Sequence, residues 1–321
     1  NEAERDTSLY NTLNSASFIA HGALIENMDI AAKEAGFKMT AELFPEGEAS
    51  SLVASIRFEG GEGEGAIEKD ALYPFIETRC TNREAYRAKG LEDSVKEALK
   101  GVTQETGHDN GKLFLIEEKF QLKIAAGVAS LNDRLLFENQ KLHDFLFAHI
   151  RWTKEEAEAT RDGMDIRTLG LNPMESRIFK LLASWSTVKF MNRFGLSRML
   201  PGKTFKVCKG SSAMGLIQME GLSPKSFVLG GRLLERVWLK ASSLGLAFQP
   251  MTGVPFLIQR LYLEEDPGLS QAHKTLLKDA EVALKKVFPI DKEKATIMLF
   301  RIGYAEEPRA RSFRQDIKIE D

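Results

Sequence analysis

Apolar residues recur at helical spacing in several parts of the chain. Between His21 and Gly36 they lie three and four positions apart, which predicts a helix that ends at Gly36. Thr153 and Glu156 have the spacing of a capping box, which predicts the start of another helix. Further helices are predicted at residues 71–78, 91–99, 113–137, 141–152 and 178–194.

Short apolar runs predict strands at residues 51–58, 205–207, 214–219 and 295–302. The first of these runs stops at residues 59–65, which contain only Gly and Glu. Glutamate charge repels phosphate and the lysine of a P-loop is missing, so this run is interpreted as a flexible linker. Together these elements predict an α+β protein that is rich in helices and has one modest sheet.

Two segments that lie 209 positions apart resemble each other. Residues 22–36 align without gaps onto residues 231–245, and five of the fifteen positions are identical; composition alone predicts roughly one match. The identical pairs are Gly22/Gly231, Leu24/Leu233, Glu26/Glu235, Ala32/Ala241 and Gly36/Gly245. Because each copy precedes a predicted strand, the chain is expected to contain two related halves. The alternative is that helix packing imposes the same pattern on two unrelated amphipathic helices.

Composition narrows the classes of function. The chain has 321 residues with 44 Lys and Arg against 46 Asp and Glu, a net charge of −2. This balance argues against a general nucleic-acid partner. The two cysteines and five scattered histidines predict neither a disulfide framework nor a metal site. No apolar stretch reaches the roughly 18–20 residues that cross a bilayer, so we expect a cytoplasmic protein with no membrane partner.

Common catalytic motifs are missing from the sequence. It contains no His-Glu-x-x-His, no Gly-x-Ser-x-Gly, no Gly-x-Gly-x-x-Gly after a strand and no Walker lysine loop. Cys80 lies between Arg79 and Arg83, and nearby cations lower the pKa of a thiol. Because no base partner is evident, an incidental cysteine is the preferred interpretation, and no catalytic side chain is predicted.

Two compact basic clusters and one turn carry the candidate chemistry. Arg79-Cys-Thr-Asn-Arg83 follows a predicted helix, and Arg309-Ala-Arg311 follows the last predicted strand. Arginine offers a planar fork of donors that fits phosphate oxygens, and a threonine hydroxyl adds a further donor. The segment 244–253 ends a helix at glycine and continues into a Pro-x-x-Gly turn, whose backbone amides are able to bond a planar heterocycle.

These segments resemble the nitroreductase superfamily of FMN-dependent oxidoreductases, and specifically the Acg-like branch, in which two nitroreductase-like halves are fused. The resemblance implies a nitroreductase-like fold, with a central mixed or antiparallel sheet flanked by helices and the two halves forming an intramolecular pseudo-dimer. Residues 1–65 would then be an incomplete first half. Residues 66–321 would be the second half, with a helical insertion or lid at about 133–202.

The resemblance also implies which residues bind FMN. Its phosphate would contact Arg79, Cys80, Thr81, Asn82 and Arg83 together with Arg309 and Arg311, and its ring would contact Pro250, Met251, Thr252 and Gly253. Thr252 stands where many nitroreductases have glutamate. The family's Pro-Ser-x-x-Asn-x-Gln-Pro-Trp segment is missing and would precede Asn1, so the sequence resembles the later part of a longer chain.

The implied activity is electron transfer from NAD(P)H through FMN to a small-molecule acceptor of the quinone or nitroaromatic type. The resemblance also allows a homodimer in addition to the pseudo-dimer. Two alternatives stay open at this point. The first alternative to this enzyme is a flavin-binding or flavin-sequestering protein with little catalytic activity. The second is a noncatalytic domain of a larger fusion.

Overall fold

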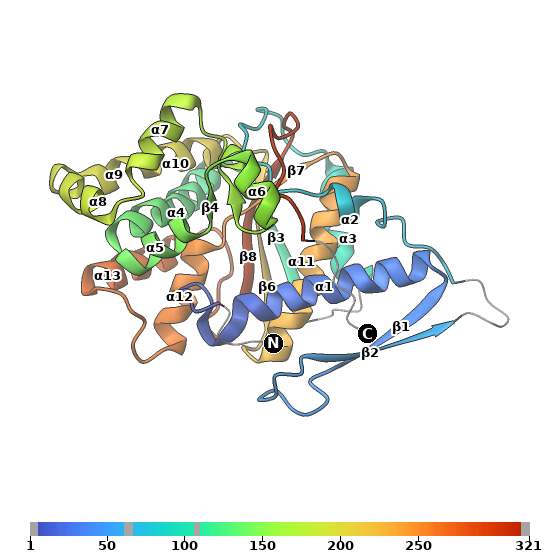
Figure 1. Cartoon of the computed structure of the whole chain (residues 1–321). Helices are drawn as coiled ribbons and strands as arrows, with labels where there is room; N and C mark the ends of the chain where they lie inside the picture. Colours follow the sequence, from blue (N-terminus) through green and yellow to red (C-terminus); the bar gives the residue numbers. More distant parts are fainter. Residues whose placement is uncertain (1–5, 61–66, 106–109, 316–321) are drawn as a thin grey trace.

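A four-stranded sheet lies at the centre of the molecule. The structure is a computed structural model and describes residues 6–60, 67–105 and 110–315. The strands are β3 (Gly111–Ile116), β6 (Ala213–Glu220), β8 (Lys294–Gly303) and β7 (Ala247–Pro250), in that spatial order. Each neighbouring pair is antiparallel. The predicted α+β class is therefore confirmed, with helices on both sides of the sheet (Figure 1).

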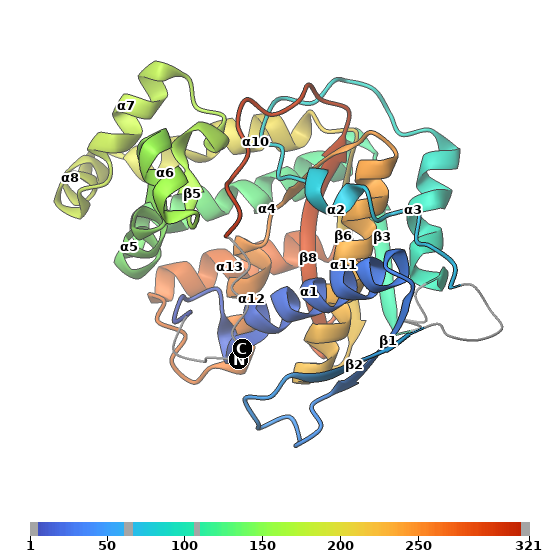
Figure 2. The same ribbon diagram turned by 45° about the vertical axis from the view of Figure 1, so that its right-hand side comes forward.

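Helices cover both faces of this sheet. As a result, β6 and β8 are buried along nearly their whole length, which agrees with their nearly continuous apolar sequences. One face packs against α11 (Pro224–Ser243), next to α3 (Asp93–Glu105), and α1 (Ser15–Glu34) packs on α11. The other face packs against α4 (Lys119–Glu138), α10 (Pro201–Lys209), α12 (Gly253–Leu263) and α13 (Gln271–Leu284). Figure 2 shows the two layers on either side of the strands.

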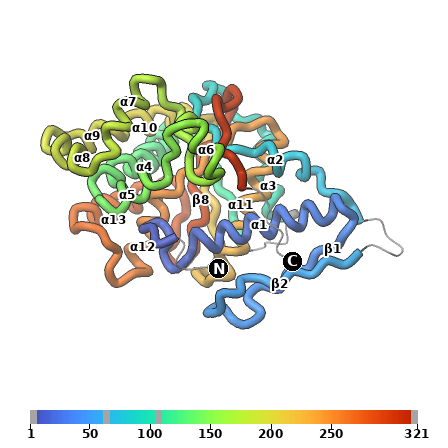
Figure 3. The backbone as a smooth tube through the Cα atoms, in the orientation of Figure 1, coloured from blue at the N-terminus to red at the C-terminus, as the bar shows by residue number. Residues whose placement is uncertain are grey.

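The remaining elements extend from the two ends of this body. At one end lie α5 (Gln140–Ala148), α6 (Lys154–Thr160), α7 (Pro173–Leu181), α8 (Trp185–Met191) and α9 (Leu196–Met199), with the short parallel pair β4 (Ile150–Arg151) and β5 (Met164–Asp165). Beyond α1 lies an antiparallel hairpin of β1 (Phe37–Leu43) and β2 (Ala54–Gly60), far from α7–α9 (Figure 3). The single-turn helix α2 (Phe75–Thr78) follows the hairpin in sequence. Short 3-10 helices occupy Thr12–Asn14, Ile166–Leu169 and Asn192–Phe194.

The two similar segments of the sequence form the helices α1 and α11, which cross in direct contact. A side-chain carbon added to Gly22 would overlap the backbone of Val228, and one added to Gly231 would overlap the backbone of Ile19. The crossing therefore requires glycine at both positions. Gly36 (φ +80°) and Gly245 (φ +68°) follow the two helices in the left-handed conformation, as predicted, and each is followed by a strand.

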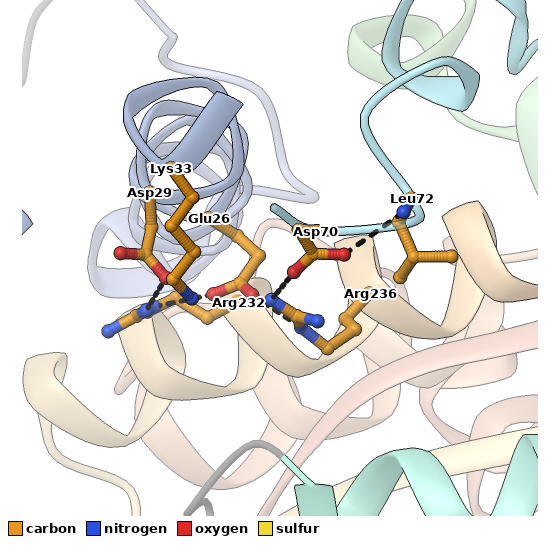
Figure 4. Close-up of polar contacts among 7 residues, drawn as sticks. All are labelled: Glu26, Asp29, Lys33, Asp70, Leu72, Arg232 and Arg236. Carbon is orange, nitrogen blue, oxygen red and sulfur yellow. Dashed lines mark hydrogen bonds and ion pairs between the residues drawn. The ribbon is translucent and has the colours of Figure 1, made fainter. Parts of the chain in front are cut away.

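An ionic network joins α1 to α11 beside this crossing (Figure 4). Glu26, which is buried on α1, accepts hydrogen bonds from Arg232 Nε at 2.8 Å and Arg236 Nε at 2.6 Å. Arg236 also contacts Asp70 at 2.9 Å, and Asp70 accepts a bond from the backbone amide of Leu72 at 3.0 Å. Because the buried carboxylate has two cationic partners, its charge is neutralised within the interface.

The structure confirms some predicted elements and corrects others. Strands 214–219 and 295–302 correspond to β6 and β8, and 51–58 overlaps β2. The predicted helix 113–137 is wrong at its start, because Gly111–Ile116 forms β3 and α4 begins at Lys119. The predicted strand 205–207 is also wrong, since these residues lie inside α10.

Other boundaries shift in smaller ways. The predicted helix 178–194 is divided between α7 and α8, and Thr153 caps α6 by accepting from Glu156 N at 3.1 Å. The Glu156 carboxylate accepts from the amide of Trp152 at 2.7 Å, so the capping box is displaced by one residue. Residues 59 and 60 of the Gly/Glu run belong to β2, and 61–66 lie outside the described residues. None of the helices in the described ranges is both long and apolar enough to cross a membrane.

Candidate functional site

The three segments singled out in the sequence, residues 79–83, 244–253 and 309–311, lie next to one another. Thr81 forms a parallel bridge with Phe248 of β7, and the amide of Asn82 donates to the Phe248 carbonyl at 2.9 Å. The strand β7 leads directly into residues 250–253. On the C-terminal side, Asn82 Nδ2 donates to the carbonyl of Glu306 at 2.8 Å, and Arg311 Nη1 donates to the carbonyl of Thr78 at 3.0 Å. Segments more than 160 positions apart are thus held together by hydrogen bonds to backbone carbonyls.

Three of the four predicted phosphate-binding arginines form ion pairs. Arg79 Nε lies 2.5 Å from the buried carboxylate of Glu235, and its guanidinium lies 4.5 Å from the centre of the Trp238 ring. Arg309 is 3.4 Å from Glu84. Arg311 is 2.7 Å from Glu307. The last two arginines are solvent-exposed, and such pairs contribute little free energy, so an incoming anion is able to compete for them.

Arg83 and Arg301 differ from these three arginines because, among the described residues, neither has a carboxylate within ion-pair distance. Arg83 donates to the Thr168 carbonyl at 3.3 Å. Arg301 has no exposed surface, and its Nη1 lacks any hydrogen-bond partner. Burial, followed by the charge of Arg301, lowers the pKa of Arg83, and burial lowers the pKa of Arg301. Arg301 Nη2 donates to the Glu84 carbonyl at 2.9 Å, and its guanidinium lies 3.8 Å from the centre of the Tyr86 ring. Arg83 is therefore the cation of this pair that lines the cavity and favours an anion there.

A cavity of 540 Å³ opens between Arg83, α4, the α7–α10 segment and the turn at 250–253. Its size lies in the usual range for small-molecule sites, about 300–1,000 Å³. Among its lining residues are Asn132, Asp133, Ile178, Met199, Thr204 and Gln249, together with Pro250, Met251, Thr252 and Gly253. Thr252 also lines a second hollow of 460 Å³, which lies between α1 and α11 and includes Arg79. The turn therefore separates the two predicted phosphate ligands Arg79 and Arg83.

The cavity wall beside this turn presents hydrogen-bond donors. Arg301 Nε donates to Gln249 Oε1 at 2.6 Å. Because arginine has no acceptor, this bond fixes the amide and leaves Gln249 Nε2 as a donor. The amide of Met251 is used by the Leu299 carbonyl at 2.7 Å, whereas the first amides of α12, which starts at Gly253, have no acceptor within the helix. With Arg83, these groups match a ligand that carries negative charge and acceptor atoms.

Asp133 places an acidic group in the same cavity. Burial raises its pKa to about 6, and a hydrogen bond with Thr204 opposes that increase. On the insertion side, Lys203 pairs with Glu175 at 2.7 Å. Asp133 is thus the cavity-lining carboxyl whose charge changes near neutral pH, and it is able to hold a proton inside the cavity.

The cysteines do not have the properties of nucleophiles. Burial raises the pKa of Cys80, although Arg311 and Arg79 act in the opposite direction. Burial raises the pKa of Cys208 to about 12. Both side chains are therefore thiols at neutral pH, which agrees with the interpretation of Cys80 as incidental. Asn82 is buried, and its amide and side chain bind backbone carbonyls, so its role in this structure is to connect segments.

The described residues hold no cluster of three or more His, Cys, Asp and Glu side chains that is suited to a metal ion. His143 is buried, and its Nε2 lies 2.8 Å from the carbonyl of Leu182. His149 Nδ1 lies 2.7 Å from the carbonyl of Phe145. Both histidines are therefore engaged in local hydrogen bonds.

Sequence analysis overlooked Arg301, Gln249 and Asp133. Arg301 did give a signal, because it is the one charged residue in the apolar run 295–302. A buried charge at such a position is costly unless it has a partner or a function. Gln249 and Asp133 gave no comparable signal, since both are of common polar types whose place in the cavity depends on tertiary packing.

Comparisons with known proteins give weak overall similarity. No family model matches the chain. The chain is 25% identical over 313 residues to the uncharacterized protein MT1398 of Mycobacterium tuberculosis (strain CDC 1551 / Oshkosh), covering 98% of this chain but 42% of that protein. The chain thus spans about two fifths of the length of the curated relative that it matches.

Solved structures similar to this chain include members of the superfamily that the sequence resembles. Iodotyrosine deiodinase bound to FMN and 3-iodo-L-tyrosine has a TM-score of 0.43 at 13% identity, covering 78% of this chain and 97% of that one. The FMN- and NADPH-dependent nitroreductase NfnB from sphigopyxis sp. strain HMH has a TM-score of 0.42 at 13% identity, covering 78% and 100%. An FMN-bound nitroreductase from Bacteroides fragilis has a TM-score of 0.39 at 11% identity, covering 78% and 96%.

Proposed function

We propose that the protein is an FMN-dependent oxidoreductase of the nitroreductase type. The observation that carries this proposal is the meeting of three distant segments beside a donor-lined cavity that contains Arg83, with the unpaired cation Arg301 bonded to its wall. FMN has a phosphate and a ring rich in hydrogen-bond acceptors. A cavity wall that carries a cation and several hydrogen-bond donors fits both. The sequence resemblance supports the same cofactor.

In this proposal the chain's residues bind and orient the cofactor. Arg83 and the side chain of Thr81 bind the phosphate, and the exposed Arg309 and Arg311 exchange their carboxylate partners for it. Arg79 lines the second hollow, across the turn from Arg83, and is assigned to the phosphate by the sequence resemblance; its Nη donors would have to reach past the turn while Nε stays with Glu235. Cys80 and Asn82 contribute through the backbone segment. Pro250, Met251, Thr252 and Gly253 support the ring, and Gln249 Nε2 donates toward it.

The chemistry that bound FMN would supply is hydride uptake from NAD(P)H followed by electron transfer to an acceptor. The part of the cavity wall formed by the buried apolar residues Phe137 and Leu182 limits water and suits a flat acceptor of the quinone or nitroaromatic class. Asp133, with a pKa near 6, is placed to deliver a proton to the reduced acceptor. NfnB, which its description gives as NADPH-dependent, supports a nicotinamide as electron donor.

A second function, flavin storage with little turnover, is favoured by one observation. Residues from α7, α9 and α10 form a wall of the cavity, which supports assignment of the insertion at about 133–202 as a lid. A lid that stays closed would hold the cofactor and exclude the nicotinamide. The proposed division into a partial first half (1–65) and a second half (66–321) fits the crossing of α1 and α11, and a homodimer is compatible with it.

Flavin titration tests the cofactor. We expect the purified protein to quench FMN fluorescence with saturation, and we expect Arg83→Ala and Arg311→Ala to weaken binding by about tenfold or more, the loss of a charge-assisted bond. Arg57→Ala, an exposed arginine on the distant hairpin, is the matched control. Equal affinity of all four proteins would refute the site, and no FMN binding by the parent protein would refute the cofactor.

Turnover distinguishes the two functions. An oxidoreductase consumes NADH or NADPH in the presence of FMN and a quinone or nitroaromatic, whereas a storage protein binds FMN without consuming either nicotinamide. The same assay separates an enzyme from a noncatalytic domain of a larger fusion, because a noncatalytic domain consumes neither nicotinamide.

A further inference from the structure

The segment from α7 to α9 exposes an unusual number of large apolar side chains. Phe194 and Met199 are 76% and 77% exposed, and Met174 and Leu181 are 72% and 68% exposed. Ile178, Phe190 and Met191 are also exposed. Soluble proteins rarely gather such residues on one continuous segment without a binding role. The helices carrying them lie together at the end of the molecule opposite the β1–β2 hairpin (Figure 1).

The same segment is strongly basic. Between Pro173 and Lys209 the sequence has eight Lys or Arg residues and one acidic residue, a net charge of +7, so the remainder of the chain carries −9. All eight cations are exposed. Within the described residues Lys203 pairs with Glu175, and the other seven form no ion pair with a carboxylate. They are Arg177, Lys180, Lys189, Arg193, Arg198, Lys206 and Lys209.

The exposed apolar and cationic residues of 173–209, called here the basic apolar face, come from helices grouped at one end of the molecule, and two of these residues line the cavity. Ile178 and Met199 belong to the face and also line the cavity. If the basic apolar face rests on a partner, a ligand that enters the cavity past these two side chains would come from that partner. This continuity connects the face to the site rather than to a remote part of the fold.

The chemistry of the face selects one kind of partner. A second copy docked through the same face would bring two surfaces of +7 together, which electrostatic repulsion opposes. Aromatic, Met and Leu side chains interspersed with Lys and Arg on short helices are typical of segments that lie in a membrane interface, where apolar groups enter the acyl boundary and cations contact anionic headgroups.

We propose that the basic apolar face binds the surface of an anionic phospholipid bilayer and turns the cavity mouth toward the lipid. This is surface attachment rather than membrane spanning, so it is compatible with the lack of a spanning helix in the described residues. It revises the expectation of no membrane partner, which considered spanning segments alone. If the proposed oxidoreductase function holds, it also makes a lipid-soluble acceptor, such as a quinone, the preferred substrate class.

Vesicle sedimentation tests the proposal without any flavin. We expect the intact protein to sediment with phosphatidylcholine vesicles that contain phosphatidylglycerol, and not with phosphatidylcholine alone. We expect raised salt to weaken the binding. Lys189→Gln and Arg193→Gln should each reduce the partition coefficient about fivefold, the contribution of one cation near an anionic surface.

Apolar variants separate insertion from simple charge attraction. The double variant Phe194→Ser, Met199→Ser should lose most of the binding, whereas Phe58→Ser, an exposed phenylalanine on the β1–β2 hairpin, should keep it. Circular dichroism confirms that each variant is folded. Lack of sedimentation with the anionic vesicles, or equal losses for both apolar variants, overturns the proposal. Retained binding to an acidic protein alone overturns it in favour of a protein partner.

Discussion

Gly22 and Gly231 lie in direct backbone contact where α1 crosses α11. They are also equivalent positions of the repeated segment, 209 residues apart. A contact between equivalent positions of two copies is what a local twofold relation between them produces. The two similar segments therefore meet at aligned glycines, and both helices need the absence of a side chain at that place.

Substitution at this crossing should be costly. Gly22→Ala or Gly231→Ala inserts a methyl group against rigid backbone, so we expect a loss of about 2–3 kcal/mol or more in the free energy of unfolding. Gly127→Ala on the exposed face of α4 meets nothing within 4 Å and should instead stabilise the protein by up to about 1 kcal/mol. Urea denaturation measures all three. Similar stability of the three variants would contradict the close crossing.

The buried carboxylate beside the crossing provides a second prediction. Glu26→Gln removes the anion that Arg232 and Arg236 share and leaves them with Asp29 and Asp70. Breaking a buried pair from one side costs about 3–5 kcal/mol when the charge is left alone, so we expect a loss below that range but well above that of an exposed pair. Glu97→Gln removes an exposed pair with Lys100 and should change stability by about 0.5 kcal/mol or less. Thermal unfolding of the two variants provides the comparison. An effect as small as that of Glu97→Gln would mean that Asp29 and Asp70 are sufficient partners for the two arginines.

Local pattern was sufficient for parts of this fold and misleading for others. The helices that end at Gly36 and Gly245 were predicted because periodicity and a terminal glycine agree there. The segment 113–137 was assigned to one helix because a short apolar run such as residues 113–116 fits either a strand or a helix turn. Pairing with β6, which the sequence does not display, makes Gly111–Ile116 a strand.

The candidate site shows the same division. Basic clusters and the Pro-x-x-Gly turn were visible because their residue types carry the chemistry. What was not visible is which guanidinium groups are already paired. The ion pair of Arg79 with Glu235 depends on where α11 packs, and the lack of one at Arg83 depends on the elements around the cavity, so both depend on the whole fold.

Cysteine reactivity gives a third prediction. Because burial raises the pKa of both thiols, we expect neither Cys80 nor Cys208 to react appreciably with a thiol reagent within minutes at pH 7.5 in the folded protein. Both should react after addition of guanidinium chloride, which serves as the internal control. Rapid labelling of Cys80 in the folded state would show that Arg79 and Arg311 outweigh burial.

The carboxyl of Asp133 predicts a dependence of stability on pH. Its pKa is about 6 in the folded protein and near 3.8 when unfolded, so the folded state holds the proton more tightly. Stability from this group is therefore fully present below about pH 4 and is lost as the pH rises to about 6. Asp133→Asn removes that loss. The free energy of unfolding of the variant should therefore exceed that of the parent by at most about 3 kcal/mol at pH 7.5 and by little at pH 4.

Thermal unfolding across pH 4 to 7.5 measures this difference, and Asp279→Asn on the exposed side of α13 controls for the loss of one carboxylate. The variant also separates the stability role from the proposed proton delivery. If Asp133 delivers the proton, then Asp133→Asn should become more stable at neutral pH while its turnover of a quinone falls and its FMN affinity is retained. A stability difference that is constant with pH would mean that the carboxyl is hydrated, and the argument for a proton held in the cavity would fail with it.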